Sequence, residues 1–98
     1  MNFSNKLITP VDIDAEKALV SCIIINSNLL YEVQVKPEWF YKPEHRLIVE
    51  SILWLHNHDK PIDYVTISEQ LRTQSKLSEA GGEEYIGTFP CGEFDPLA

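Results

Sequence analysis

The sequence of 98 residues has few of the features that mark several large classes of protein. Its two cysteines, Cys22 and Cys91, are far apart, and a secreted scaffold of this size usually carries more. No stretch approaches the roughly 20 apolar residues of a membrane-spanning helix, and the first ten residues lack the apolar core of a signal peptide. We therefore expect a protein of the reducing cytoplasm without membrane contact. A disulfide between the two cysteines is the less favoured alternative.

Basic residues are also few and scattered. Fifteen acidic residues outweigh eight basic ones, the net charge is −7, and no two basic residues are adjacent. Because duplex binding depends on neutralising phosphates with Lys and Arg, we expect no direct contact with nucleic acid. Glycine is scarce as well, and the single glycine pair, Gly81-Gly82, is followed by Glu83-Glu84, which would repel phosphate. The sequence therefore predicts no phosphate-binding loop and no nucleotide cofactor.

Candidate catalytic and metal-binding groups do not converge in the sequence. His56 and His58 are two residues apart, so on a helix they diverge by about 200° and cannot chelate one metal ion together. Cys22 has no activating histidine nearby in the sequence and is most simply a small core residue. An acidic cluster is explained by helix capping and the helix dipole, and it consists of Asp12, Asp14 and Glu16. The sequence thus predicts no metal, no cofactor and no enzymatic activity.

The first helix is predicted from about Ile13 to Ile25, with Asp12 as its N-cap. Its apolar residues form two stripes on nearly opposite sides. One stripe is expected to face the core, and it contains Ala15, Ala18, Leu19, Cys22 and Ile25. The other stripe is Val20 and Ile24, a candidate protein-interaction site if it stays near the surface. The alternative is that a short second helix, or an N-terminal arm with Leu7 and Ile8, covers this pair.

Proline and the apolar pattern place the next two helices. A short helix is predicted from Leu29 to about Val35, capped by Ser27 or Asn28 and stopped by Pro37. Pro43 suits the first position of a third helix that reaches about His58. The third helix has only a narrow polar strip, so we expect it to be central. Its main inward face is Ile48, Ile52 and Leu55.

The last third of the chain is also predicted to be helical. A fourth helix starts near Asp63 or Thr66, and Thr66 with Glu69 is typical of a capping box. Gly81 is expected to close a turn in the left-handed conformation. A last helix then presents one apolar face, consisting of Tyr85, Ile86 and Phe89. We predict an all-α domain of about four main helices plus short helical turns over residues 12–89, between an N-terminal arm, 1–11, and a loosely ordered tail, 90–98.

Three consecutive aromatic residues, Trp39, Phe40 and Tyr41, follow Pro37 at a corner of the chain. They cannot all point inward, so at least one should be partly exposed. Phe40 and Trp54 are expected in the core. Trp39 and Tyr41 are candidate protein-interaction residues, since exposed aromatic side chains dominate the energetics of interfaces.

The order of motifs along the chain resembles the N-terminal domain of the DnaB-type replicative DNA helicases. The motifs are Pro10 and Asp14-Ala15-Glu16, then Lys36-Pro37, Phe40-Tyr41, Pro43 and His45, then Lys60-Pro61-Ile62-Asp63, Val65-Thr66 and Glu69-Gln70-Leu71, and finally Gly81-Gly82 and Tyr85. Each motif is weak alone, but the ordered set at matching spacing is specific.

The resemblance implies a non-catalytic collar domain, or a fragment, of a replicative helicase. Such a domain serves dimer and oligomer assembly and takes part in docking primase. The family's ATPase domain and its long helical hairpin have no counterpart in these 98 residues, so a stand-alone truncated relative that regulates or decoys the helicase or primase is the alternative. A helix-turn-helix DNA-binding protein, with its unit starting at 63–71, is a lesser alternative that the acidity opposes.

Overall fold

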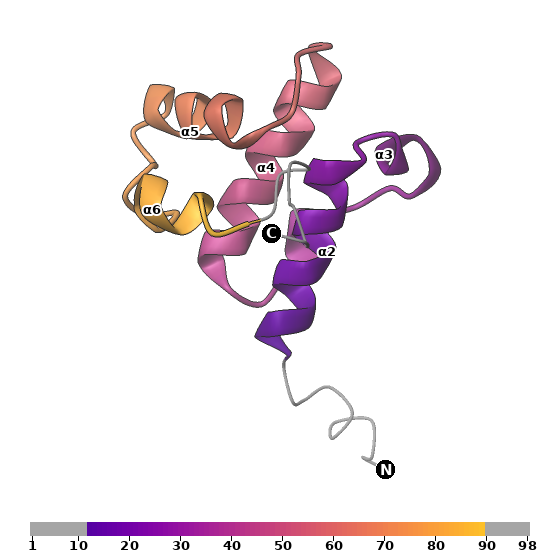
Figure 1. Ribbon diagram of the computed structural model, residues 1–98, viewed down its shortest axis with the longest axis horizontal. Coiled ribbons are helices and arrows are strands. Elements are labelled where there is room, and N and C mark those ends of the chain that lie inside the picture. Colours follow the sequence, from indigo (N-terminus) through magenta and orange to yellow (C-terminus); the bar gives the residue numbers. More distant parts are fainter. Residues whose placement is uncertain (1–11, 90–98) are drawn as a thin grey trace, which may run out of the picture.

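The computed structural model describes residues 12–89 and shows an all-helical fold (Figure 1). Its elements are α2 (Ile13–Ile25), α3 (Leu29–Glu32), the 3-10 turn η1 (Pro37–Trp39), α4 (Pro43–Asn57), α5 (Tyr64–Thr73) and α6 (Gly82–Ile86). No strand occurs between residues 12 and 89. The predicted fold class is therefore confirmed, whereas the expectations for the arm and the tail lie outside the described residues.

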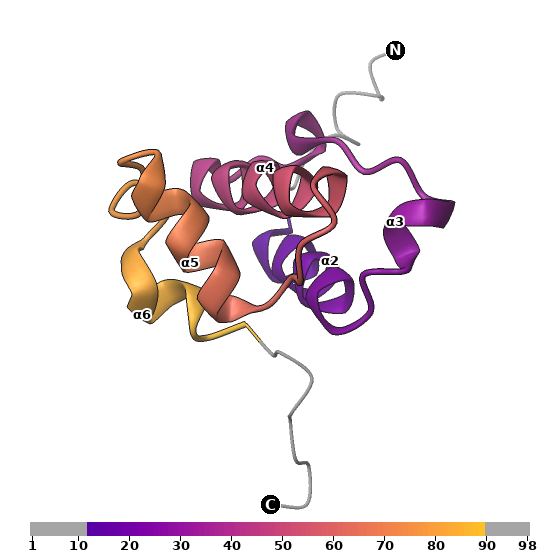
Figure 2. The same cartoon turned by 90° about the horizontal axis from the view of Figure 1, so that it is seen from above.

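Helix α4 forms the centre of the domain. Helices α2 and α5 and the turn η1 all pack on it, and α6 packs on α5 (Figures 1 and 2). The predicted inward face of α4 is confirmed, because Ile48, Ile52 and Leu55 are at most 3% exposed. Helix α3 lies on the far side of α2 from α5 and α6, and it contributes no buried residue (Figure 2).

The core gathers apolar side chains from segments far apart in the chain. Its buried members are Val20, Ile23, Ile24, Val35, Phe40, Ile48, Val49, Ile52, Leu55, Ile67, Leu71, Ala80, Ile86 and Phe89. Trp54 is half-buried and packs against this cluster. The burial of Phe40 and the inward face of α6 agree with the sequence predictions.

Helix ends follow the sequence in most places. The Asp12 carboxylate accepts a hydrogen bond from the Ala15 N–H at 3.0 Å, which confirms the predicted N-cap of α2. Pro43 occupies the first turn of α4. Helix α3 differs, because it ends at Glu32 rather than near Val35, and Asn28 makes no side-chain cap. The extended backbone after α3 lets Val35 reach the core.

The capping box of α5 lies about one helical turn earlier than predicted. Asp63 is the N-cap; its carboxylate accepts the Thr66 N–H, and the Thr66 hydroxyl oxygen accepts the Asp63 N–H, each at 2.9 Å. The expected pairing of Thr66 with Glu69 is therefore wrong. Asp63 already offers a strong cap, and the earlier start adds backbone hydrogen bonds to the helix.

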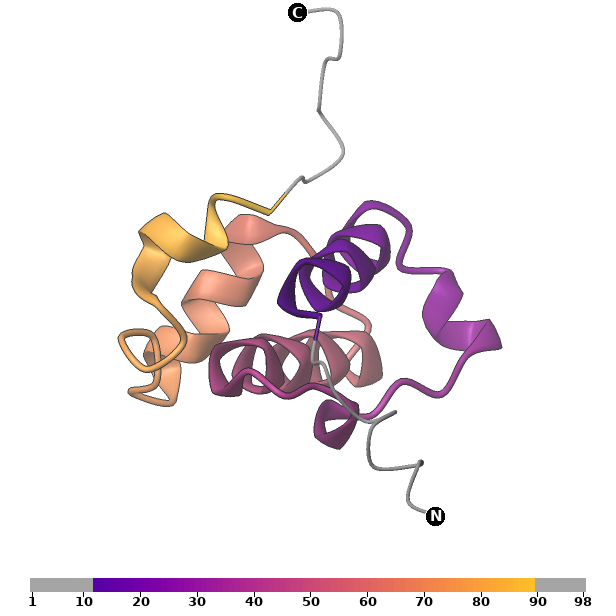
Figure 3. The ribbon, with the colours of Figure 1, turned by 90° about the horizontal axis from the view of Figure 1, so that it is seen from below.

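Helix α2 faces the opposite way from the prediction. Val20, Ile23 and Ile24 are 0%, 1% and 6% exposed and belong to the core. The pair Val20 and Ile24 is therefore covered, which was the alternative to its being a surface site, although α4 packs on this helix rather than the short helix named in that alternative. The stripe expected to be inward is exposed instead, and it consists of Ala15, Ala18, Leu19, Cys22 and Ile25. Figure 3 shows α2 side by side with α4, which is the element that covers the buried face.

The helix is apolar nearly all round, so periodicity alone could not choose between its two sides. Burying Val20, Ile23 and Ile24 removes three branched side chains from water, whereas the opposite stripe is partly alanine and cysteine. Glu16 shares the buried side of the helix, and its hydrogen bonds to the segment before α4 add a polar reason for this orientation.

Candidate protein-contact surface

Residues 12–89 contain no cluster of three His, Cys, Asp or Glu side chains that could hold a metal ion. No helix in this range is long and apolar enough to cross a bilayer. His56 and His58 lie at the C-terminal end of α4, where the His58 ring stacks on Trp54 with centroids 3.8 Å apart. The main network of polar side chains lies elsewhere, between α2, α4 and α6.

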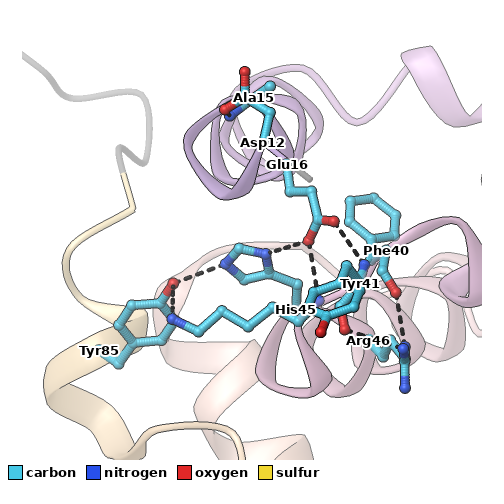
Figure 4. A network of polar contacts seen from close by, with 9 residues as sticks. Asp12, Ala15, Glu16, Phe40, Tyr41, His45, Arg46 and Tyr85 are labelled. Atoms are coloured by element: carbon cyan, nitrogen blue, oxygen red, sulfur yellow. Dashed lines mark hydrogen bonds and ion pairs between the residues drawn. The ribbon is translucent and has the colours of Figure 1, made fainter. Parts of the chain in front are cut away.

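Glu16 reaches from α2 to the segment that joins η1 to α4 (Figure 4). Its Oε2 accepts the Tyr41 N–H at 2.6 Å, and its Oε1 accepts the Lys42 N–H at 3.3 Å. His45 Nδ1 lies 2.9 Å from the same Oε1. One carboxylate thus satisfies backbone donors just before the first turn of α4, where the helix dipole also favours a negative charge.

His45 is completely buried and bridges α2 to α6. Its Nε2 lies 2.7 Å from the Tyr85 hydroxyl oxygen, on the side opposite Glu16 (Figure 4). A carboxylate can only accept, so Nδ1 carries a proton and donates to Glu16, and in the neutral ring Nε2 then accepts the Tyr85 O–H. Lys42 Nζ donates to the same hydroxyl oxygen at 3.4 Å. Every polar atom of the buried ring therefore has a partner.

The pKa of Glu16 reflects opposing influences. Burial alone would raise the pKa of this carboxyl, but the hydrogen bonds from the Tyr41 N–H, His45 and the Lys42 N–H outweigh burial, and the net pKa is lowered. Glu16 is consequently ionised at neutral pH. The earlier explanation of Glu16 by capping and dipole alone was incomplete.

Gly81 completes this arrangement from the other side. Its φ is +101°, in the left-handed region that was predicted for it, and an added Cβ would lie 2.7 Å from the Cβ of Tyr85. Glycine is needed here for both reasons. Gly81, Tyr85, His45 and Glu16 all belong to the motifs noted in the sequence, so these motif residues serve the fold. Their spacings of 29 and 40 residues gave no local signal that Glu16, His45 and Tyr85 meet.

An open groove of about 360 Å³, which we call the α2–η1 groove, lies on the surface beside this network. It is lined by Asp12, Ala15, Glu16, Leu19, Trp39, Phe40 and Tyr41. Trp39 is 54% exposed, Tyr41 63% and Leu19 40%. The predicted exposure of the aromatic corner is confirmed, whereas the role of Trp39 and Tyr41 in binding a partner stays a prediction.

The groove continues into the exposed apolar stripe of α2. Beyond Leu19 this stripe contains Cys22 and Ile25, and Ile25 is 52% exposed. Sequence reasoning missed these residues as surface candidates because it assigned them to the core. The signal in the sequence was that α2 is apolar on two sides. Such a helix is ordinarily covered on both, so whichever side the domain leaves uncovered is a candidate contact surface.

Comparison with known proteins agrees with the motifs. The family profile described as "DnaB-like helicase N terminal domain" matches residues 8–89. The replicative DNA helicase DnaB of Leifsonia xyli is 32% identical over 82% of this chain, and the replicative DNA helicase DnaC of Bacillus subtilis is 32% identical over 84%. The chain spans 18% of the length of each of these two helicases.

A solved structure extends the likeness to three dimensions. The crystal structure of the N-terminal domain of DnaB helicase from Mycobacterium tuberculosis matches with a TM-score of 0.75 at 28% identity, over 82% of this chain and 57% of that one. Sequence profile, relatives and fold thus each match more than four fifths of the chain. The chain belongs to the family of DnaB-like helicase N-terminal domains.

Proposed function

We propose that this chain is a non-catalytic protein-contact domain of a cytoplasmic DNA-replication assembly. In that role it contributes to oligomer assembly of a replicative helicase, including self-association as a dimer, and to docking of a primase. The observation that carries the proposal is the match of residues 8–89 to the helicase N-terminal domain alone. The exposed aromatic and aliphatic side chains of the α2–η1 groove supply a surface suited to protein contact.

Charge supports protein rather than DNA as the partner. The net charge is −7, and phosphate backbones would be repelled on average. Arg72, on the exposed side of α5, pairs with Glu69 and Glu83. A recognition helix would instead leave such a cation available to phosphates or base edges.

The test uses the purified chain with the replicative helicase and the primase encoded in the same genome. Light scattering measures self-association, and biolayer interferometry measures binding to each of the two proteins. The proposal expects the chain to dimerise or to bind at least one of them at micromolar concentration, without ATP hydrolysis. A monomer that binds neither protein contradicts it. Inhibition of helicase-driven unwinding by added chain would instead assign it a regulatory or decoy role.

A further inference from the structure

We propose that the α2–η1 groove binds a basic amphipathic helix of a different protein, and not a second copy of this chain. The inference rests on the proposed function, because it names the surface that makes the contact and the chemistry of the partner. It follows from the apolar anchors of the groove, the charges around it and the geometry of its walls.

The groove has the anchors that binding requires. Trp39 and Tyr41 project more than half of their surface into solvent, and Leu19 stands across from them on α2. Aromatic side chains in such positions contribute most of the binding energy at protein interfaces. The adjoining face of α2, with Cys22 and Ile25, is equally uncovered within the described part of the chain. Covering such an apolar strip with another apolar surface removes it from water, which lowers the free energy of the complex.

The charges around the groove are mainly acidic. Asp12 and Glu16 line it, and Glu38, next to Trp39, is exposed. The guanidinium of Arg46 donates to the carbonyls of Phe40 and Tyr41 at 2.7 and 3.0 Å, so one positive charge stands beside these three carboxylates. Lysine or arginine flanking the apolar residues of a partner would therefore meet favourable potential.

The walls of the groove favour a helix as the ligand. One wall is α2 and the other is the short turn η1, and residues 12–89 offer no sheet edge to which a strand could add. Helix-in-groove recognition uses apolar anchors at i, i+3 or i+4, and i+7. The groove's seven lining residues are fewer than the roughly 20–30 residues that each side of a standard interface contributes, so we expect affinities of roughly 1–100 μM.

A second copy of the chain is the poorer occupant. In a two-fold contact the same patch meets itself, so Asp12 and Glu38 of one copy would face the acidic rim of the other. Like charges brought together in this way oppose association. Self-association, which the proposed function includes, is therefore expected to use another face of the domain.

The experiment selects helical peptides from a display library with a randomised surface, using the purified, folded chain as the target. Enriched peptides are expected to carry apolar anchors at helical spacing flanked by Lys or Arg. Their affinities are then measured by fluorescence anisotropy. Leu19→Glu and Trp39→Ala should each weaken binding about tenfold or more. The matched controls are Val65→Glu and Tyr31→Ala, which change more exposed apolar and aromatic residues elsewhere and should leave binding unchanged.

The charge contribution is tested separately. Asp12→Asn combined with Glu38→Gln keeps an N-cap side chain on α2 but removes two charges, and it should weaken binding about three- to tenfold at low salt and little at high salt. Glu32→Gln combined with Glu50→Gln removes two exposed charges away from the groove and serves as the control.

Several results would overturn the inference. They are a selection that yields no binder, binders that are acidic, binders indifferent to Leu19→Glu and Trp39→Ala, or a homodimer that Leu19→Glu abolishes. No helicase or primase is used in the selection, so its failure is distinct from failure of the proposed function. Folding of each variant is checked by circular dichroism. If Leu19→Glu or Trp39→Ala does not fold, the variant Asp12→Asn with Glu38→Gln still tests the inference.

Discussion

Each nitrogen of the buried His45 ring has a partner on a different helix, Glu16 on α2 and the Tyr85 hydroxyl on α6. Lys17 adds to the contact between α2 and α6, since its ammonium lies 4.9 Å from the Tyr85 ring centroid and donates to the Thr88 hydroxyl at 2.6 Å. The polar contacts among these three helices therefore depend on a few side chains. That makes their loss measurable in a domain with a small free energy of unfolding.

Replacing His45 by alanine should lower the free energy of unfolding by about 3 kcal/mol, because the change leaves a cavity and removes one hydrogen bond from Glu16 and one from Tyr85. Tyr85→Phe removes one hydroxyl and should cost about 1 kcal/mol. Urea unfolding measures both. Tyr31→Phe is the control, since Tyr31 is 74% exposed. A loss below about 1 kcal/mol for His45→Ala would mean that the network contributes little to the fold.

The lowered pKa of Glu16 gives a pH dependence of known sign. Because the folded-state pKa lies below the unfolded one, the unfolded chain binds more protons, and the contribution of Glu16 is present above the unfolded pKa and lost as pH falls through the folded pKa. Glu16→Gln should therefore be less stable than the parent at pH 7, and the difference should shrink toward pH 3. A difference in unfolding free energy that stays constant between these pH values would contradict the assignment.

At the scale of single elements, α2 shows where sequence reasoning succeeds and where it fails. Its bounds and its Asp12 cap were predicted, because capping is a local property of the chain. Its orientation was not, because both of its sides are apolar and the choice depends on contacts with α4 and on the distant His45. Helix α4 was predicted correctly on both counts, since its narrow polar strip leaves one possible orientation.

The orientation of α2 can be tested with two paired variants. Val20→Glu with Ile24→Glu places two carboxylates in the core and should unfold the domain, because each buried charge costs several kcal/mol. Leu19→Glu with Ile25→Glu places the same charges on the exposed face and should change the unfolding free energy by less than about 1 kcal/mol. Circular dichroism during heating distinguishes them. The opposite outcome would restore the orientation expected from the sequence.

The turn before α6 depends on two glycines that differ in one respect. Gly81 and Gly82 both have positive φ, +101° and +80°, but an added Cβ would meet the Tyr85 side chain only at Gly81. Gly82→Ala should cost about 1 kcal/mol through backbone strain alone. Gly81→Ala should cost about 3 kcal/mol, since steric overlap is added to the strain. If chemical denaturation shows equal losses of unfolding free energy for the two variants, the turn adjusts to the added methyl group without steric overlap.

For the whole molecule, the sequence predicted the all-helical fold and the family, but it placed part of the candidate surface on the wrong side of α2. The motifs carried the family assignment because their order along the chain is recognisable before any contact is known. Three of their residues, Glu16, His45 and Tyr85, meet in the long-range network. The surface could not be derived in the same way. It consists of the residues that remain uncovered once α2 has packed on α4, which only the three-dimensional arrangement reveals.

The central claim is that this domain acts through the α2–η1 groove and the adjoining face of α2. Amide hydrogen exchange of the chain, measured with and without the replicative helicase or primase that binds it, tests this claim most directly. Because contact slows local opening and solvent access, we predict new protection over residues 15–25 and 39–41, with α5 and α6 unchanged. A complex that protects α5 or α6 and leaves residues 15–25 and 39–41 unprotected would contradict the account.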